Sequence, residues 1–213
     1  MATRRERHLD QLEELADEIR ANGGEARAMG VDARDEDATS ALFERIETEI
    51  APLEVVVFNV GANVRFPITQ TTSRVYRKVW EMAAFAGFLA GREAARVMLP
   101  RGRGTIIFTG ATAATRGGSG YAAFAGAKHA LRALAQSMAR ELGPKGIHVA
   151  HAIVDGLMDG TFARGIDPNA EQRLAQGRII DPAAVAATYV DLWKQPRGAW
   201  THELDLRPWT ETF

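Results

Sequence analysis

Apolar positions along the chain follow two different periods. Between Leu9 and Ile19 they recur at helical spacing among charged side chains, and Gly23-Gly24 ends this predicted helix. Residues 53–60 instead form a run rich in valine, which is typical of a strand buried on both of its faces. Helical and strand signals therefore occur in the same chain.

These signals alternate along the sequence. Helices are predicted at 9–19, 35–50, 72–99, 121–142 and 182–194, and strands at 25–31, 53–60, 105–109, 147–154 and 204–206. The last helix has Asp181 as its N-cap and Pro182 at its first position. Alternating helices and buried strands predict an α/β fold, a doubly wound parallel sheet with helices on both faces. No repeat or linker divides residues 1–213, so a single domain is expected.

Composition excludes several classes of function. The 213 residues include 26 basic and 27 acidic side chains, a balance that argues against a nucleic-acid or membrane-surface partner. The absence of cysteine excludes disulfides and thiol chemistry. No apolar run approaches the ~20 residues of a membrane span, and the basic start lacks the apolar segment of a secretory signal. A cytoplasmic protein is therefore expected.

The turns after four predicted strands share a composition suited to ligand binding. Ligands of such sheets bind beyond the carboxyl ends of the strands. The four turns, at 31–35, 58–63, 108–113 and 155–156, are small, polar or glycine-bearing. Each turn alone also fits the ordinary needs of a strand-to-helix connection. Four in succession favour a ligand site at this edge.

Residues in and after these turns resemble a known family. Phe58-Asn59-Val60-Gly61 is similar to the family's Asn-Asn-Ala-Gly turn, and residues 104–109 to the strand that carries its catalytic serine. The run from Lys128 to Val149 is similar to its active-site helix and the strand that follows. Over residues 3–156 the chain thus resembles the short-chain dehydrogenase/reductase family. The resemblance implies a Rossmann-like fold and NAD(P)-linked chemistry on a carbonyl compound or an alcohol.

The resemblance also implies a set of cofactor contacts. Asp32 stands where the family contacts the adenine, and Arg4 and Arg5 stand where it reads the 2′-phosphate, which favours NADP. Lys128 stands where the family lysine bonds the nicotinamide ribose. The implied cofactor-binding residues are Arg4, Asp32, Ala33, Asn59, Gly61 and Lys128.

Three catalytic positions depart from the family pattern. The family pairs a tyrosine with a lysine four residues later, and the lysine lowers the pKa of the phenol that transfers the proton. Here Phe124 precedes Lys128, Ala111 stands at the serine position and Ala83 at the asparagine position. Losing the proton donor alone would lower the rate roughly 10²–10⁴-fold.

Two nearby hydroxyls are candidate substitutes. Tyr121 lies three residues before Phe124, and Thr112 follows the serine position. Tyr121 lies seven residues from Lys128, about 10 Å along a helix. Each residue also has a non-catalytic interpretation. Tyr121 fits an aromatic side chain that packs on a loop at the start of the helix, and Thr112 fits a turn or capping residue. Together with Lys128 they are the candidate catalytic residues, and no histidine has a spacing that predicts a metal site.

The start of the chain departs from the family as well. The family begins with a strand, a glycine-rich turn, a helix and a second strand, and residues 2–5 resemble only the end of that second strand. The glycine-rich turn is the one that holds the cofactor pyrophosphate. Either residues 25–31 pair with 53–60 across the resulting gap, or the natural product starts upstream of Met1, which we favour.

Two functions remain open. The first is an NADP-linked reductase or dehydrogenase with weak or no turnover. The second is a non-catalytic protein that binds a nucleotide, a small molecule or another subunit. The substrate is unknown, because residues 157–180 carry no distinctive polar pattern. A homodimer or homotetramer is expected because helices 72–99 and 121–142 are apolar on more than one face, and the family pairs these helices.

Overall fold

The strands of the protein form two parallel sheets. The computed structural model describes residues 2–4 and 9–211. Within them β3, β4, β5 and β6 form one four-stranded sheet in that order, and β1 and β2 form a second, two-stranded sheet. The strands are β1 Ala2–Arg4, β2 Ala28–Gly30, β3 Val55–Phe58, β4 Gly104–Thr109, β5 Ile147–Val154 and β6 Glu203–Leu206.

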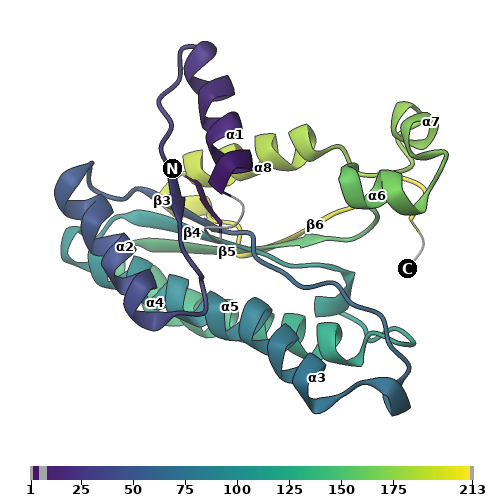
Figure 1. The fold of residues 1–213 in the computed structure, drawn as a ribbon. Coiled ribbons are helices and arrows are strands. Elements are labelled where there is room, and N and C mark those ends of the chain that lie inside the picture. Colours follow the sequence, from purple (N-terminus) through teal and green to yellow (C-terminus); the bar gives the residue numbers. More distant parts are fainter. Residues whose placement is uncertain (1, 5–8, 212–213) are drawn as a thin grey trace.

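Helices cover the sheet in two layers, as Figure 1 shows. One layer contains α2, α4 and α5, and the other contains α1 and α8. The helices are α1 Leu9–Ala21, α2 Glu36–Glu49, α3 Ser73–Trp80, α4 Ala86–Met98, α5 Ala122–Leu142, α6 Thr161–Ile166, α7 Ala170–Ala175 and α8 Pro182–Lys194. The doubly wound parallel α/β architecture predicted from the sequence is confirmed.

The two predicted helix starts follow from capping. The Asp35 side chain accepts a hydrogen bond of 3.0 Å from the Ala38 amide at the start of α2. The Asp181 side chain accepts one of 2.8 Å from the Ala183 amide at the start of α8, directly before Pro182. Each carboxylate satisfies an amide that has no partner within its helix.

The predicted long helix 72–99 is interrupted. A π-helical turn, Glu81–Phe85, separates α3 from α4. The wider turn inserts an extra residue and rotates α4 relative to α3. Val79 on α3 and Leu89 on α4 are both buried, with exposed fractions of 3% and 0%.

The main core lies between the sheet and the layer of α4 and α5. Phe108 on β4 and Leu131 on α5 are fully buried in it. A smaller cluster, formed by Ile107, Ala150 and Leu192, lies under α8 on the opposite face. Because both faces are covered, every residue of β4 and β5 is buried, and the carboxyl ends of these strands are held rigidly.

Strand β3 differs from its prediction. The run at 53–60 was expected to be buried on both faces, but Phe58 is its buried strand residue and the Val57 side chain is 44% exposed. The expectation is wrong because β3 is an edge strand. It pairs with β4 on one side, and no strand of the described residues pairs with its other side.

The first strands also refine the prediction. Ala2–Arg4 forms β1, so the second strand of the family pattern is present here as a three-residue strand rather than missing. Strand β2 pairs with β1, Ala2 opposite Ala28, and does not pair with β3. Of the two alternatives, the less favoured one, in which residues 25–31 pair with 53–60, is therefore wrong.

Two short helices that the sequence did not predict follow β5. Helices α6 and α7 lie in the segment between Val154 and α8, and a single parallel bridge joins Met158 to Ile180. Because this segment leaves the carboxyl end of β5, it lies beside the edge where the turns were expected to bind a ligand (Figure 1).

Candidate functional site

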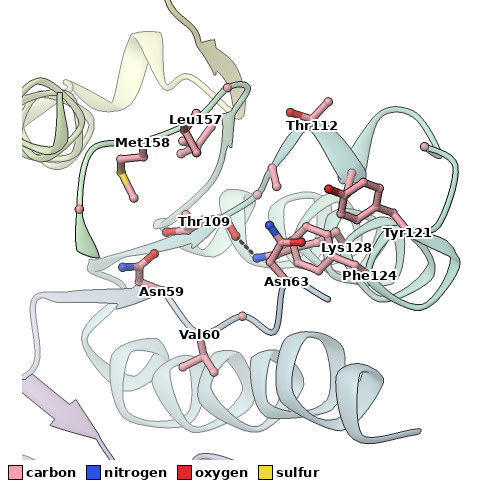
Figure 2. A pocket seen from close by; sticks show the side chains of 18 of the residues that line it. Asn59, Val60, Asn63, Thr109, Thr112, Tyr121, Phe124, Lys128, Leu157 and Met158 are labelled. Carbon is pink, nitrogen blue, oxygen red and sulfur yellow. Dashed lines mark hydrogen bonds between the residues drawn. The ribbon is translucent and has the colours of Figure 1, made fainter. Parts of the chain in front are cut away.

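A cavity of about 940 Å³ lies at the carboxyl ends of β3, β4 and β5. Its wall is formed by the turns after these strands, the start of α5 and the start of the segment after β5 (Figure 2). The lining includes Asn59, Gly61, Asn63, Gly110, Thr112, Tyr121, Phe124, Lys128, Leu157 and Met158. Cavities of this size and position are typical ligand sites of doubly wound sheets.

Five of the residues singled out from the sequence meet in this cavity. Asn59 and Gly61 come from the turn after β3, Thr112 from the turn after β4, and Tyr121 and Lys128 from the start of α5. The rule that strand ends gather at one edge thus places both candidate cofactor contacts and candidate catalytic residues in one cavity.

The other cofactor candidates lie elsewhere. Asp32 lines a separate hollow of about 410 Å³, and its carboxylate is 2.6 Å from the Arg34 guanidinium. Ala33 packs against the main core. The backbone of Arg4 belongs to β1, while its side chain and the whole of Arg5 lie outside the described part of the chain.

The Lys128 amine is buried at the cavity wall. Its side chain is 4% exposed, and Nζ donates a hydrogen bond of 2.7 Å to the carbonyl oxygen of Thr109, drawn as a dashed line in Figure 2. Among the described residues no carboxylate forms an ion pair with it. Loss of hydration disfavours the charged form, which lowers the pKa of Lys128 to about 8.

The three departures from the family pattern lie in one apolar cluster. Phe124 and Ala83 are core members, 8% and 0% exposed, and Ala111 packs against them. The Phe124 ring centroid lies 5.9 Å from the Lys128 Nζ atom. Replacing three polar groups together avoids leaving any one of them buried without a partner. The cavity wall therefore has a consistent apolar lining beside the amine.

Thr112 is tied to a carboxylate that the sequence analysis did not single out. Its hydroxyl donates a hydrogen bond of 2.5 Å to Asp155, which is 3% exposed and lies 3.6 Å from the Arg116 guanidinium. A hydroxyl has one proton, so in this arrangement Thr112 has only lone pairs left for a ligand. It is therefore poorly suited to polarise a carbonyl by donation. The turn at 155–156 was the available signal for Asp155.

Tyr121 occupies the N-cap position of α5 without a side-chain capping bond. The Arg65 guanidinium lies over its ring, 5.8 Å from the centroid. In the view of Figure 2, Phe124 lies between Tyr121 and the Lys128 amine.

A buried polar network supports the floor of the cavity. The His151 side chain is fully buried, its Nδ1 lies 2.9 Å from a carboxylate oxygen of Glu203, and Arg132 donates two bonds to the same carboxylate. Burial lowers the pKa of His151 despite Glu203. Its Nε2 has no hydrogen-bond partner among the described residues and faces Gly110, where a Cβ atom would lie 2.5 Å away. The network joins distant segments, so no spacing predicted it.

The family comparison agrees with this geometry. Residues 3–170 match the protein family described as short chain dehydrogenase. The chain belongs to the short-chain dehydrogenase family. This confirms the resemblance inferred from the turns and from the run that begins at Lys128, and it places the chain among oxidoreductases.

Individual short-chain dehydrogenases are similar to this chain over much of its length. A solved member from Rhodopseudomonas palustris is 52% identical, with a TM-score of 0.82, over 98% of this chain and 85% of that one. The 2-dehydro-3-deoxy-D-gluconate 5-dehydrogenase of Pseudoalteromonas atlantica is 26% identical over 84% of this chain and 76% of that enzyme. Several other curated relatives are matched over only 48–59% of their length.

One structural neighbour was solved with a nucleotide. A putative NAD(P)-dependent gluconate 5-dehydrogenase from Beutenbergia cavernae, with bound NADP at low occupancy, has a TM-score of 0.82 at 23% identity. The similarity covers 93% of this chain and 82% of that chain, and it shows a shared short-chain dehydrogenase fold. In the described part of the present chain, no helix is long and apolar enough to cross a lipid bilayer.

We expect the Lys128 amine to make the stability of the fold depend on pH in the alkaline range. Its pKa is about 8 in the folded chain against an ordinary value of 10.5, so between these values the unfolded chain binds more protons. The free energy of unfolding therefore rises as the pH increases through this window, by at most about 3 kcal/mol.

Urea unfolding of the unmodified chain and of Lys128→Met measures this effect, because titrations common to both cancel in their difference. The unmodified chain should gain stability relative to the variant between about pH 7.5 and about pH 10. Parallel stability curves for the two proteins would show that the amine is not desolvated.

Proposed function

We propose that this short-chain dehydrogenase is an NAD(P)-linked oxidoreductase, with NADP favoured, whose turnover of carbonyl compounds or alcohols is weak or absent. One observation carries the proposal. Phe124 and Ala111 line the cavity together with Lys128, and Ala83 is buried in the same apolar cluster. The cavity lies at the strand ends, where sheets of this kind bind their ligands, and Phe124 stands where the family pattern predicts the tyrosine that transfers a proton.

The residues of the chain fit a nicotinamide dinucleotide only in part. The cavity at the strand ends has room for a ring system, and Asn59 and Gly61 offer it polar and backbone contacts. The Lys128 amine would orient a ribose with the N–H bonds that Thr109 does not use. Gly117 and Gly118 line the cavity before α5, but they follow the 3-10 helix Thr112–Ala114 rather than a strand, so they do not form the strand–turn–helix site that usually anchors a pyrophosphate. A bound nicotinamide would supply hydride transfer.

A non-catalytic role is the second candidate function. The cavity is retained while its proton-transfer groups are absent, and its wall combines an apolar cluster with a few polar side chains. That combination is typical of a site that binds a small molecule. Detectable turnover would favour the first function, because a binding protein would hold a ligand without oxidising NADPH.

We also propose that the chain forms a homodimer or homotetramer. An exposed aromatic row runs from α3 to α4, with Tyr76, Trp80 and Phe88 between 39% and 45% exposed. Trp80, Phe85 and Phe88 stack in sequence with centroids 6.2 Å apart. An apolar row of this kind on a helix is a favourable surface for a second copy.

Light scattering at micromolar concentration tests the oligomer. The mass should be at least twice the 23.2 kDa of one chain, and the double substitution Trp80→Glu and Phe88→Glu should shift it toward the monomer. Val190→Glu, at a 44% exposed position on α8, is the matched control and should leave the mass unchanged. A monomeric unmodified chain would contradict this part of the proposal.

Nucleotide binding is expected to be weak. The adenine candidate Asp32 lines a different hollow from the cavity, and within the described residues no short glycine-rich turn that runs directly from a strand into a helix lines the cavity. Titration of NADPH fluorescence should therefore give a dissociation constant well above 1 μM, weaker than about −8 kcal/mol. A constant near or below 1 μM would contradict weak binding.

Restoring the proton donor should not restore turnover by itself. Phe124→Tyr rebuilds the phenol four residues before Lys128, and Ala111→Ser adds a hydroxyl opposite it. Hydride transfer also needs the nicotinamide within about 3–3.5 Å of the reacting carbon. We expect the double variant to show no measurable loss of NADPH absorbance with a panel of aldehydes and ketones.

The unmodified chain is the reference for that assay. Its clear turnover of any carbonyl in the panel would overturn the proposed loss of activity and would point to Tyr121 or Thr112 as the donor. In that case Tyr121→Phe should abolish turnover if Tyr121 is the donor, and Thr112→Val should do so if Thr112 is.

A further inference from the structure

We propose that the Lys128 amine is a covalent binding site, which forms an imine with small uncharged aldehydes and ketones that enter the cavity. The inference goes beyond the oxidoreductase proposal. It requires no nucleotide and no hydride transfer.

The position of the amine supports this proposal. Lys128 lines the cavity, and within the described residues Nζ has one hydrogen-bond acceptor, the Thr109 carbonyl at 2.7 Å. On another side stands Gly61, where an added Cβ atom would lie 3.7 Å from Nζ. Because glycine places no side chain there, a small carbonyl group can approach the nitrogen from the cavity.

The surroundings keep the amine reactive. A lysine held by a carboxylate stays protonated and cannot attack a carbonyl, but here Nζ donates to the neutral Thr109 carbonyl and lies 5.9 Å from the centroid of the Phe124 ring. The titratable neighbour His151 is itself kept neutral by burial. At pH 7.5 a pKa of about 8 leaves roughly a quarter of the amines unprotonated, against roughly 0.1% for an ordinary lysine. Desolvated lysines of this kind are effective nucleophiles.

The reaction balances without any external oxidant or reductant. The Nζ lone pair attacks the carbonyl carbon, and a proton moves from nitrogen to oxygen to give a carbinolamine. Loss of water from this adduct leaves a carbon–nitrogen double bond. Water regenerates the amine in the reverse direction, so the adduct is reversible unless a reductant traps it.

The lining selects the class of ligand. Phe124, Leu157 and Met158 offer apolar surface, while Asn59 and Asn63 offer amide groups near the turn after β3 (Figure 2). An aldehyde with a compact apolar or aromatic body fits this combination. Benzaldehyde is therefore a suitable probe.

The chain provides its own reference amines. It contains four lysines, of which Lys78, Lys145 and Lys194 are exposed and Lys128 is buried. The folded protein is treated with benzaldehyde and cyanoborohydride at pH 7.5, and digestion with mass spectrometry gives the rate at each lysine. The N-terminal α-amine, with an ordinary pKa near 8, is followed on its own peptide. We expect Lys128 to be modified at least ~10-fold faster than the other three lysines.

Two glycine variants test whether the cavity is responsible. Gly61→Leu places a side chain over the amine without altering Lys128, and should slow its modification several-fold. Gly198→Leu is the matched control, because an added Cβ atom there meets nothing within 4 Å, and it should leave the rate unchanged. Unfolding in urea should bring the rate at Lys128 down to that of the other lysines.

Several outcomes of these measurements would contradict imine formation in the cavity. Modification of Lys128 no faster than of the exposed lysines in the folded chain overturns the proposal. A fast rate that persists in urea, or that Gly61→Leu leaves unchanged, also overturns it, because the cavity would then play no part. None of these measurements uses a nucleotide. Their outcome is therefore independent of NADPH binding and turnover, and a failure of this proposal can be distinguished from a failure of the oxidoreductase proposal.

Discussion

The burial of one amine beside an apolar wall is the constraint on which the site depends. Lys128 holds the carbonyl of Thr109 at the carboxyl end of β4, and so joins α5 to the sheet where the cavity opens. A buried amine must find an acceptor or lose its proton. Here it finds a single neutral acceptor and its pKa falls to about 8. The position of the turn after β4 and the reactivity of the nitrogen therefore have the same physical origin.

The surrounding substitutions act as a set rather than singly. A phenylalanine at 124 beside a serine at 111 would leave a hydroxyl facing an apolar ring, whereas Ala111, Ala83 and Phe124 pack together. Two of the polar side chains discussed above are already engaged: Thr112 donates to Asp155, and Asp32 is bound to Arg34. This short-chain dehydrogenase therefore carries packed apolar side chains at the three positions where the family pattern predicts polar ones.

Local patterns in the sequence predicted most helices and strands. The features that they predicted wrongly depend on pairing between segments that are distant in the sequence. The caps at Asp35 and Asp181 and the largely apolar strand 147–154 specify their elements through neighbouring residues alone. The exposure of Val57 depended instead on which strands pair, which its own sequence does not encode. At the site, the sequence predicted which turns would line the cavity, because a parallel sheet brings the carboxyl ends of its strands together. The position of Lys128 followed from the resemblance to the family. The bond from Thr112 to Asp155 spans 43 residues and was not.

The close approach of His151 to Gly110 limits the order in which this sequence can change. Any side chain at position 110 would place its first carbon 2.5 Å from the imidazole nitrogen, a distance that a buried ring tied to Glu203 has little freedom to relieve. Replacement of His151 by a smaller residue would have to come first, and it would leave the Glu203 carboxylate with Arg132 as its main partner. The two positions are therefore epistatic, and a lineage that acquired the histidine could not easily regain a larger residue at the floor of its cavity.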